Sequence, residues 1–374
     1  MKKSSSIDYL IISAAYPYRG GISDSTHSLV NQMSNQNISC EVWTFKLLYP
    51  KLFFPGKTQY SQEVFKSDFK IVREISTLNP INWIITAQKI NKIGPTKIIL
   101  RYWTPLLSIS YFIISCLLNN KTKVIGLVDN WSGHEKILFE GFFRKLFIKS
   151  CDRFISFSEN VAENLKNNTN KKVLPLFHPI NDHLPNKISK DEALYNLNLP
   201  SKKYILFIGL IRKYKGVESL IKAFHYVSKE HKNLRLIIAG EFYDDITIYK
   251  KLIKRKGIED IVIIDDNFLE SSKIRDYICV SDIVVQPYKK ASQSGITPVA
   301  YFYDKPLVVS NIEGLKEIII EDQSGEIFDE TPANLAIAIK SSINPESNKN
   351  YSNNIAKSKV KYSWSRFVKK IEVF

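Results

Sequence analysis

Short apolar runs alternate with helical patterns along the whole chain. The runs are rich in Val, Ile and Phe, which is typical of strands buried on both faces of a parallel sheet. Such alternation predicts α/β architecture with helices on both faces of parallel sheets, and so many strands require two sheets. Strands are expected at residues 7–13, 41–45, 97–101, 123–128, 153–157 and 172–175, and then at 204–208, 235–239, 261–265, 282–286 and 307–310.

The boundary between the two predicted sheets falls in a segment without a sustained apolar stripe. Residues 178–203 are rich in Pro, Asn and Lys, which is typical of a connection between domains. We therefore expect a Rossmann-like domain at 1–180, a linker at 181–203, a second Rossmann-like domain at 204–355 and a closing helix at 356–374.

Composition sets the broad class of protein. The chain has 374 residues, of which 44% are hydrophobic and 24% charged, and these values suit two globular domains. Its 4 cysteines are scattered, which argues against a disulfide framework or a thiolate metal site and favours a reducing, cytoplasmic location. The N-terminal apolar run resembles the core of a signal peptide, but Asp8 interrupts it, so a buried first strand is expected.

The net charge of +16 is spread along the chain. It leaves two interpretations open: a solvated lysine-rich surface, or attraction to an anionic membrane at its inner face and to nucleotide-borne substrates. No nucleic-acid recognition motif is present, so no nucleic-acid partner is expected. Residues 103–118 are mostly apolar, but Pro105 and three serines interrupt them, and they predict a packed helix in place of a membrane span.

The segment from Asp282 to Glu317 carries the clearest candidate chemistry. A short apolar strand is followed by a loop, a serine-rich helix start and another strand after Pro306. A helix start at the end of a parallel strand presents free N–H groups and a positive dipole, which suit a phosphate, although a serine there can also be a plain helix cap. The residues expected to face an anion are Ser292, Gln293, Ser294, Gly295 and Ile296.

Four further motifs occur in a consistent order along the chain. They are residues 16–22 (YPYRGGI), 129–135 (DNWSGHE), 209–216 (GLIRKYKG) and 237–241 (IIAGE). Together with Ser-Gln-Ser-Gly at 292–295, they resemble GT-B glycosyltransferases, in particular the retaining family 4. The resemblance implies two Rossmann-like domains facing across a cleft, with the acceptor bound by the N-terminal one and the nucleotide sugar by the C-terminal one. It also implies that the final helix crosses back to the N-terminal domain.

The chain departs from the family pattern at one place. Many members carry two glutamates in the donor motif, and Ala291 and Val299 stand at those positions here. The second glutamate usually holds the donor ribose, so its loss leaves the ribose contact and the donor identity open. A subgroup with Ser-Gln-Ser-Gly in this place is similar to the present chain.

The resemblance also assigns roles to single residues. Arg212 and Lys215 would bind the donor diphosphate, and cations there would offset the charge that develops as the sugar leaves. His134 would contact the transferred sugar, and Asp129 would be an orienting or acceptor-side group. An ordinary basic loop and a structural histidine are the alternatives. The other residues assigned to donor binding are Gly21, Gly240 and Glu241, the last of which could equally be a helix-start acid.

The combined prediction is transfer of a sugar from a nucleotide diphosphate to an acceptor hydroxyl with retention of configuration. The acceptor would be a saccharide or a lipid-linked molecule in surface polysaccharide or glycolipid synthesis. No Asp-x-Asp triplet occurs, so neither a metal nor a cofactor is expected. A nucleotide-sugar epimerase of the same fold, and a catalytically degenerate relative that binds a nucleotide sugar or a partner transferase, remain as alternatives.

Overall fold

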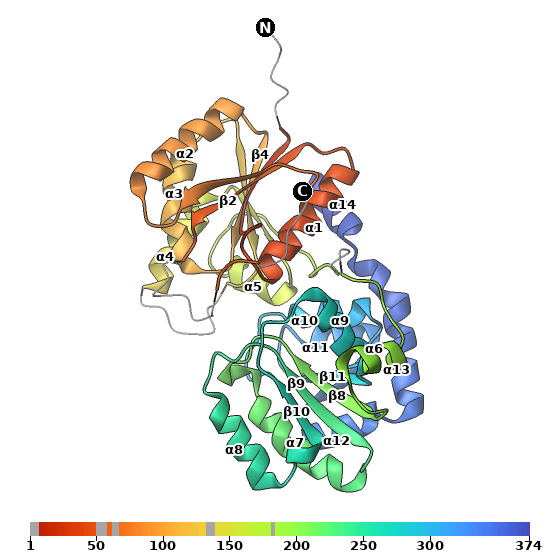
Figure 1. Ribbon diagram of the computed structural model, residues 1–374. Coiled ribbons are helices and arrows are strands. Elements are labelled where there is room, and N and C mark those ends of the chain that lie inside the picture. The colour runs from red at the N-terminus through yellow and green to blue at the C-terminus, as the bar shows by residue number, and fades with distance from the viewer. Residues whose placement is uncertain (1–6, 50–57, 62–66, 132–138, 181–183) are drawn as a thin grey trace. The chain divides into compact units, whose positions relative to one another are not determined.

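The computed structural model describes residues 7–49, 58–61, 67–131, 139–180 and 184–374 (Figure 1). The chain divides into two compact units. The N-terminal unit is formed by Met1–Pro179 together with Trp364–Phe374, and the C-terminal unit by Ile180–Ser363.

A parallel sheet forms the centre of the N-terminal unit. Its order among the described residues is β3-β2-β1-β4-β5-β6-β7. The strands are β1 (Tyr9–Ile12), β2 (Cys40–Leu47), β3 (Ile71–Ser76), β4 (Lys97–Tyr102), β5 (Lys123–Val128), β6 (Arg153–Ser156) and β7 (Val173–Pro175). The helices are α1 (Gly21–Asn35), α2 (Pro80–Ile93), α3 (Ser108–Cys116), α4 (Glu140–Ser150), α5 (Glu159–Lys166) and α14 (Trp364–Val373).

Two apolar layers cover the two faces of this sheet. Helices α2 to α5 contribute to one layer, which contains Trp83, Tyr111 and Phe147. Helices α1 and α14 contribute to the other, and Figure 1 shows α2, α3 and α4 together, away from α1 and α14. The strands are therefore buried on both faces, which explains why they read as nearly continuous apolar runs.

Helix α14 returns the end of the chain to the N-terminal unit. Trp364, Phe367, Val368 and Ile371 are fully buried, and their spacing places them on one helical face. The ring of Phe367 stacks on Phe157 with centroids 5.4 Å apart. Contacts of this kind fix the last eleven residues against the sheet.

The C-terminal unit contains a second parallel sheet, in the order β10-β9-β8-β11-β12-β13. Its strands are β8 (Lys203–Ile208), β9 (Leu234–Ala239), β10 (Val262–Asp265), β11 (Ile283–Gln286), β12 (Leu307–Ser310) and β13 (Gly325–Phe328). Its helices are α6 (Lys190–Leu197), α7 (Val217–Glu230), α8 (Ile246–Lys256), α9 (Ser271–Val280), α10 (Ile296–Phe302), α11 (Lys316–Asp322), α12 (Pro332–Ser342) and α13 (Pro345–Ser358).

The predicted α/β class with two parallel sheets is confirmed. Edge strands β3 and β13 were not predicted from the sequence, because β3 contains two adjacent charged residues and β13 begins with Gly-Glu. Both are only partly buried and lack a long apolar run.

Two connecting segments differ from their predicted form. Residues 181–203 contain helix α6, which packs against α9 and buries Ala193 and Leu194. Residues 356–374 do not form one helix: α13 ends at Ser358, a 3-10 turn covers Lys359–Tyr362, and α14 begins at Trp364. The extended backbone of Ser363 separates that turn from α14.

Candidate functional site

The loop after β8 brings Lys215 next to the start of α10. Gly209 opens this loop with a φ of +126°. A Cβ placed on Gly209 would lie 3.4 Å from Nζ of Lys215 and 3.6 Å from Cδ1 of Ile296. Residues from two distant segments, both expected to bind an anion, therefore flank one glycine at the carboxyl end of the sheet.

A second glycine lets two loops cross beside this position. Gly240 follows β9 with a φ of +132°, and a Cβ there would lie 2.1 Å from the carbonyl oxygen of Gly209. Only glycine fits, since any side chain would meet backbone. Glu241 is buried, and its carbonyl accepts a hydrogen bond from the N–H of Ile211 at 2.9 Å. Gly240 and Glu241 thus hold the backbone of the cationic loop.

Aromatic rings support both cations of this loop. The ammonium of Lys215 lies 5.2 Å from the ring centre of Tyr288, and the guanidinium carbon of Arg212 lies 4.9 Å from that of Tyr243. The hydroxyl of Tyr288 is 3.5 Å from Oγ of Ser294. Tyr288 therefore lies against both Lys215 and the serine-rich segment. Cation–π contacts of this kind orient a charge without neutralising it.

Lys215 is half-buried, and its ammonium lies close to the Gly209 turn and the ring of Tyr288. Burial is the main cause that lowers the pKa of Lys215 below its ordinary value; Tyr214 opposes the shift and the Arg212 cation adds to it. A phosphate anion placed beside the ammonium would offset the costs of burial and of like charge. The loop is therefore electrostatically suited to an anion.

The serine-rich segment is held in place by the next loop. The hydroxyl of Ser294 accepts the N–H of Ile296 at 3.2 Å, but Ser294 is not the cap residue of α10 that the sequence left as an alternative, because Gly295 occupies that position. Gly314 has a φ of +89°, and a Cβ there would lie 2.4 Å from the carbonyl oxygen of Ser292. Both carboxylate oxygens of Glu317 accept the N–H of Gly314 at 2.9 Å.

Helix α10 begins later than expected. Its first residue is Ile296, and Gly295 occupies the cap position with helical dihedral angles. Ser292 and Gln293 lie before the helix and are half-buried, whereas Gly295 is exposed. Residues 292–294 are therefore a loop that leads into α10, and only Ile296 of the predicted anion-binding residues lies in the helix.

In the N-terminal unit, Asp129 forms a buried ion pair that the sequence analysis missed. Its carboxylate accepts two hydrogen bonds from Arg101, at 2.8 Å from Nε and 2.7 Å from Nη2. Arg101 also donates from Nη1 to the carbonyl of Ile22 at 3.0 Å and to Thr26 at 2.9 Å. Because Gly21 is the first residue of α1, the pair fixes the turn that carries it. An arginine at the end of an apolar strand is the signal that could have drawn attention to it.

The other residue assigned to catalysis, His134, lies outside the described residues. Glu135 of the same motif also lies outside them. Among the described residues, no group of three or more His, Cys, Asp or Glu is arranged to hold a metal ion.

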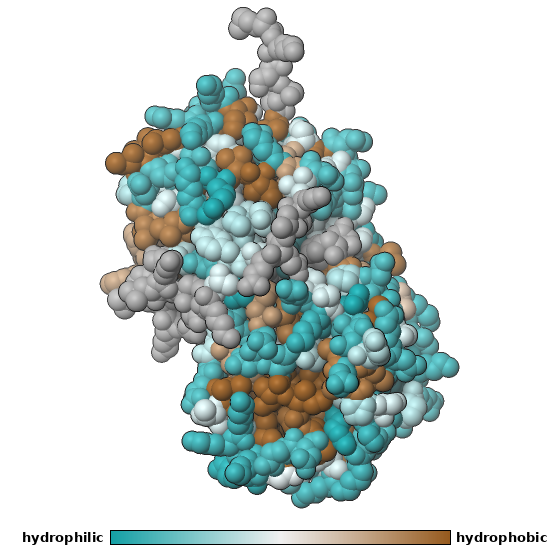
Figure 2. All heavy atoms as spheres, viewed as in Figure 1, coloured by the Kyte–Doolittle hydropathy of each residue, from teal (hydrophilic) through white to brown (hydrophobic). Residues whose placement is uncertain are grey.

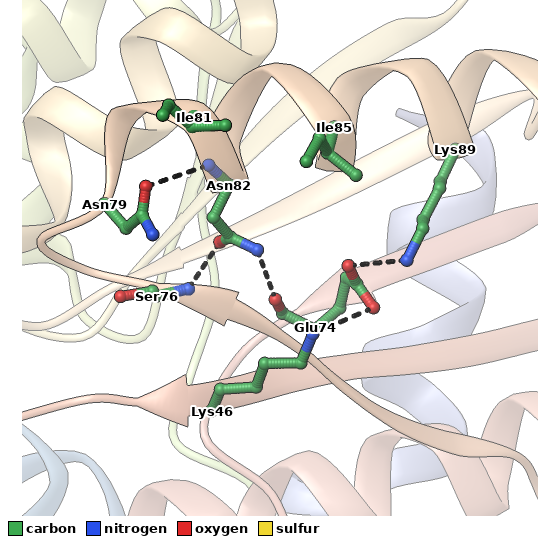
Figure 3. A pocket seen from close by; sticks show the side chains of 8 residues that line it. All are labelled: Lys46, Glu74, Ser76, Asn79, Ile81, Asn82, Ile85 and Lys89. Carbon is green, nitrogen blue, oxygen red and sulfur yellow. Dashed lines mark hydrogen bonds and ion pairs between the residues drawn. The ribbon is translucent and has the colours of Figure 1, made fainter.

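A hollow of about 380 Å³ lies elsewhere, on the N-terminal unit (Figure 3). The carboxylate of Glu74 is buried there and pairs with Lys89 at 2.8 Å and Lys46 at 3.7 Å. The remaining lining residues are Ser76, Asn79, Ile81, Asn82 and Ile85. None of the residues assigned to donor binding lines this hollow.

Comparison with solved structures defines the class of fold. Sucrose-phosphate synthase from Thermosynechococcus elongatus has a TM-score of 0.77 at 13% identity, over 98% of this chain and 97% of that one. The protein HepE of Anabaena, solved with UDP-glucose, has a TM-score of 0.73 at 14% identity, over 98% of this chain and 100% of that one. The fold is that of the GT-B glycosyltransferases, as the resemblance implied.

Sequence comparison finds similarity to one family over part of the chain. Residues 190–359, less than half of the 374-residue chain, match the model of the glycosyl transferases group 1. Two uncharacterized glycosyltransferases of Methanocaldococcus jannaschii are similar. One is 22% identical over 96% of this chain and 95% of its own length, and the other 29% identical over 45% and 43%. The family match thus lies in the C-terminal unit, and the similarity to the first of these relatives extends along nearly the whole chain.

Proposed function

We propose that the protein transfers a sugar from a nucleotide diphosphate to an acceptor hydroxyl with retention of configuration. The observation that carries the proposal is the placement of Lys215 beside Gly209 and Ile296, with Arg212 on the same loop. Two cations and the backbone N–H groups of a helix start suit a diphosphate that gains charge as the sugar leaves. The chain would be one of the family 4 members with Ser-Gln-Ser-Gly in place of the two glutamates.

The proposed donor is a nucleoside diphosphate sugar bound by the C-terminal unit. The UDP-glucose complex of Anabaena HepE, a protein of similar fold, supports this class of ligand. Arg212 and Lys215 would offset the diphosphate charge, while Gly240 and Glu241 hold their loop. The segment 292–296 would present its N–H groups to the phosphates.

The proposed chemistry is same-face displacement. The bond between the anomeric carbon and the donor phosphate breaks while the acceptor hydroxyl attacks the same face. A phosphate oxygen of the donor takes the hydroxyl proton, so we assign no nucleophile on the protein. The ion pair of Arg101 and Asp129 would act by positioning the Gly21 turn, and His134 is proposed to contact the sugar.

The acceptor is proposed to be a saccharide or a lipid-linked molecule in surface polysaccharide or glycolipid synthesis. The proposed location is cytoplasmic, at the inner face of the membrane. An epimerase would instead return a changed nucleotide sugar without an acceptor, and a degenerate relative would bind and release the donor unchanged. Nuclear magnetic resonance of the products separates these outcomes, because each leaves a different anomeric signal.

The donor class can be tested by calorimetric unfolding with UDP-, GDP-, ADP- and CDP-sugars. One of them is expected to stabilise the C-terminal unit by about 2.7 kcal/mol at a hundredfold excess over Kd. Calorimetry is required because tryptophan fluorescence does not report on the C-terminal unit. All 5 tryptophans lie in the N-terminal unit, at residues 43, 83, 103, 131 and 364. A midpoint that no nucleotide sugar moves would contradict the proposed donor site.

The lowered pKa of Lys215 predicts an alkaline loss of donor affinity. Its ammonium loses the proton below the ordinary lysine value of 10.5, so diphosphate binding is expected to weaken before that pH is reached. By the same linkage, the free protein gains stability as the pH rises through the folded pKa towards 10.5, because the folded state disfavours the protonated form.

The matched variant for this test is Lys215→Arg, which keeps its charge throughout this range. Titration calorimetry of both proteins with the same nucleoside diphosphate should show affinities that diverge as the pH rises. Parallel pH profiles for wild type and variant would exclude Lys215 as the titrating group.

A further inference from the structure

Helices α2 and α3 expose an apolar surface on the N-terminal unit. Ile81, Ile84 and Ile85 of α2 are 70%, 45% and 42% exposed, Leu106 of the 3-10 turn before α3 is 45% exposed, and Ile109 of α3 is 36% exposed. The two helices pack against each other. Figure 2 shows hydrophobic residues gathered along the edge of this unit where Figure 1 places α2 and α3. These five residues are called the α2–α3 surface below.

The sequence around this surface lacks acidic residues. No Asp or Glu occurs between Glu74 and Asp129, a stretch that includes the whole of α2 and α3. Exposed lysines lie along it, namely Lys92, Lys121 and Lys123, together with Lys89, which pairs with Glu74 at 2.8 Å. On α2, Ile81, Ile85 and Lys89 are spaced by four residues and so lie along one ridge, as Figure 3 shows. Apolar and cationic side chains thus share one face.

This combination identifies the kind of partner. Large apolar side chains grouped on a surface indicate a binding face, and lysines that outnumber carboxylates around it are complementary to negative charge. Helix α2 has 14 residues and α3 has 9. Within the described part of the chain, no helix has the length and apolar character needed to cross a membrane. Grouped apolar side chains together with lysines suit binding in the plane of an anionic lipid surface, with the apolar residues below the headgroups and the lysines at the phosphates.

We propose that the α2–α3 surface docks the N-terminal unit onto an anionic lipid bilayer. Docking would bring the protein to a lipid-linked acceptor, and this purpose rests on the proposed function. The docking itself does not. The docking rests on Ile81, Ile84, Ile85, Leu106 and Ile109, and on the lysines Lys92, Lys121 and Lys123 of the same acid-free stretch. Residues 103–118, expected from the sequence to pack as an ordinary buried helix, are thus partly turned outwards.

Vesicle co-sedimentation tests the apolar part of this surface. The vesicles contain phosphatidylcholine with or without phosphatidylglycerol, and the variant is I81Q/I84Q/I109Q. Wild type is expected to bind the anionic vesicles, and the variant to bind at least tenfold more weakly. The matched control is I248Q/I320Q/I337Q, which changes three exposed isoleucines on separate helices of the C-terminal unit and should bind like wild type.

The lysines are tested separately. The variant K92Q/K121Q is expected to lose about tenfold or more in binding at low salt, since each lysine near an anionic surface contributes about 1 kcal/mol. Added salt should weaken wild type in the same way. Equal binding to neutral and anionic vesicles would overturn the proposed charge complementarity.

The remaining outcomes also decide the question. Unchanged anionic binding by I81Q/I84Q/I109Q would overturn the proposal. So would vesicle-independent self-association of wild type that this variant abolishes in sedimentation velocity, because a second copy would then occupy the surface. Circular dichroism and nucleoside diphosphate affinity of each variant, expected to match wild type, show that the protein is folded. They also separate a failure of docking from a failure of the donor site.

Discussion

Replacing Asp129 with alanine is expected to lower the free energy of unfolding of the N-terminal unit by about 3–5 kcal/mol. The substitution leaves the guanidinium of Arg101, which is 1% exposed, buried without the carboxylate that accepts two of its hydrogen bonds. Tryptophan fluorescence in a urea titration measures this unit alone, because all 5 tryptophans belong to it.

The double variant R101M/D129L provides the control. It removes both charges and leaves apolar side chains of similar size, so it should lose less stability than D129A. Its cost includes the hydrogen bonds that Arg101 donates to Ile22 and Thr26 in the first two turns of α1. If D129A has the same free energy of unfolding as wild type, the ion pair does not stabilise the N-terminal unit.

The double variant R212M/K215M is expected to weaken donor binding by about a hundredfold or more. A hydrogen bond to a charged group contributes about 1.5–3 kcal/mol, and two such contacts to a diphosphate are removed together. Titration calorimetry with the nucleoside diphosphate identified in the donor panel measures the change in Kd.

Lys213→Met is the matched control for this loop. Lys213 lies between the two proposed ligands but is exposed, and its loss should change Kd little. Calorimetric unfolding should show that both variants are folded, since Lys215 bears a cost of burial that methionine does not. Wild-type affinity in R212M/K215M would exclude this loop as the diphosphate site.

The elements of the fold could largely be predicted from the sequence because their signals are local. Strands such as β8 and β9 are apolar runs bounded by polar loops, and their type follows from periodicity alone. The strand–loop–helix unit from β11 to α10 is contiguous in the sequence, so the candidate anion site could be predicted from the same local pattern. Edge strands β3 and β13 and helix α6 were missed because their apolar positions are few.

The tertiary structure alone decided which distant residues meet. Tyr288 lies beside Lys215, and Gly240 crosses Gly209, although 73 and 31 positions separate the members of these pairs. The ion pair of Arg101 with Asp129 joins the ends of two neighbouring strands. The outward face of α3 likewise depends on what packs around it. Periodicity specifies which side of an element is apolar, but the partner of that side is determined only when the sheet order brings the elements together.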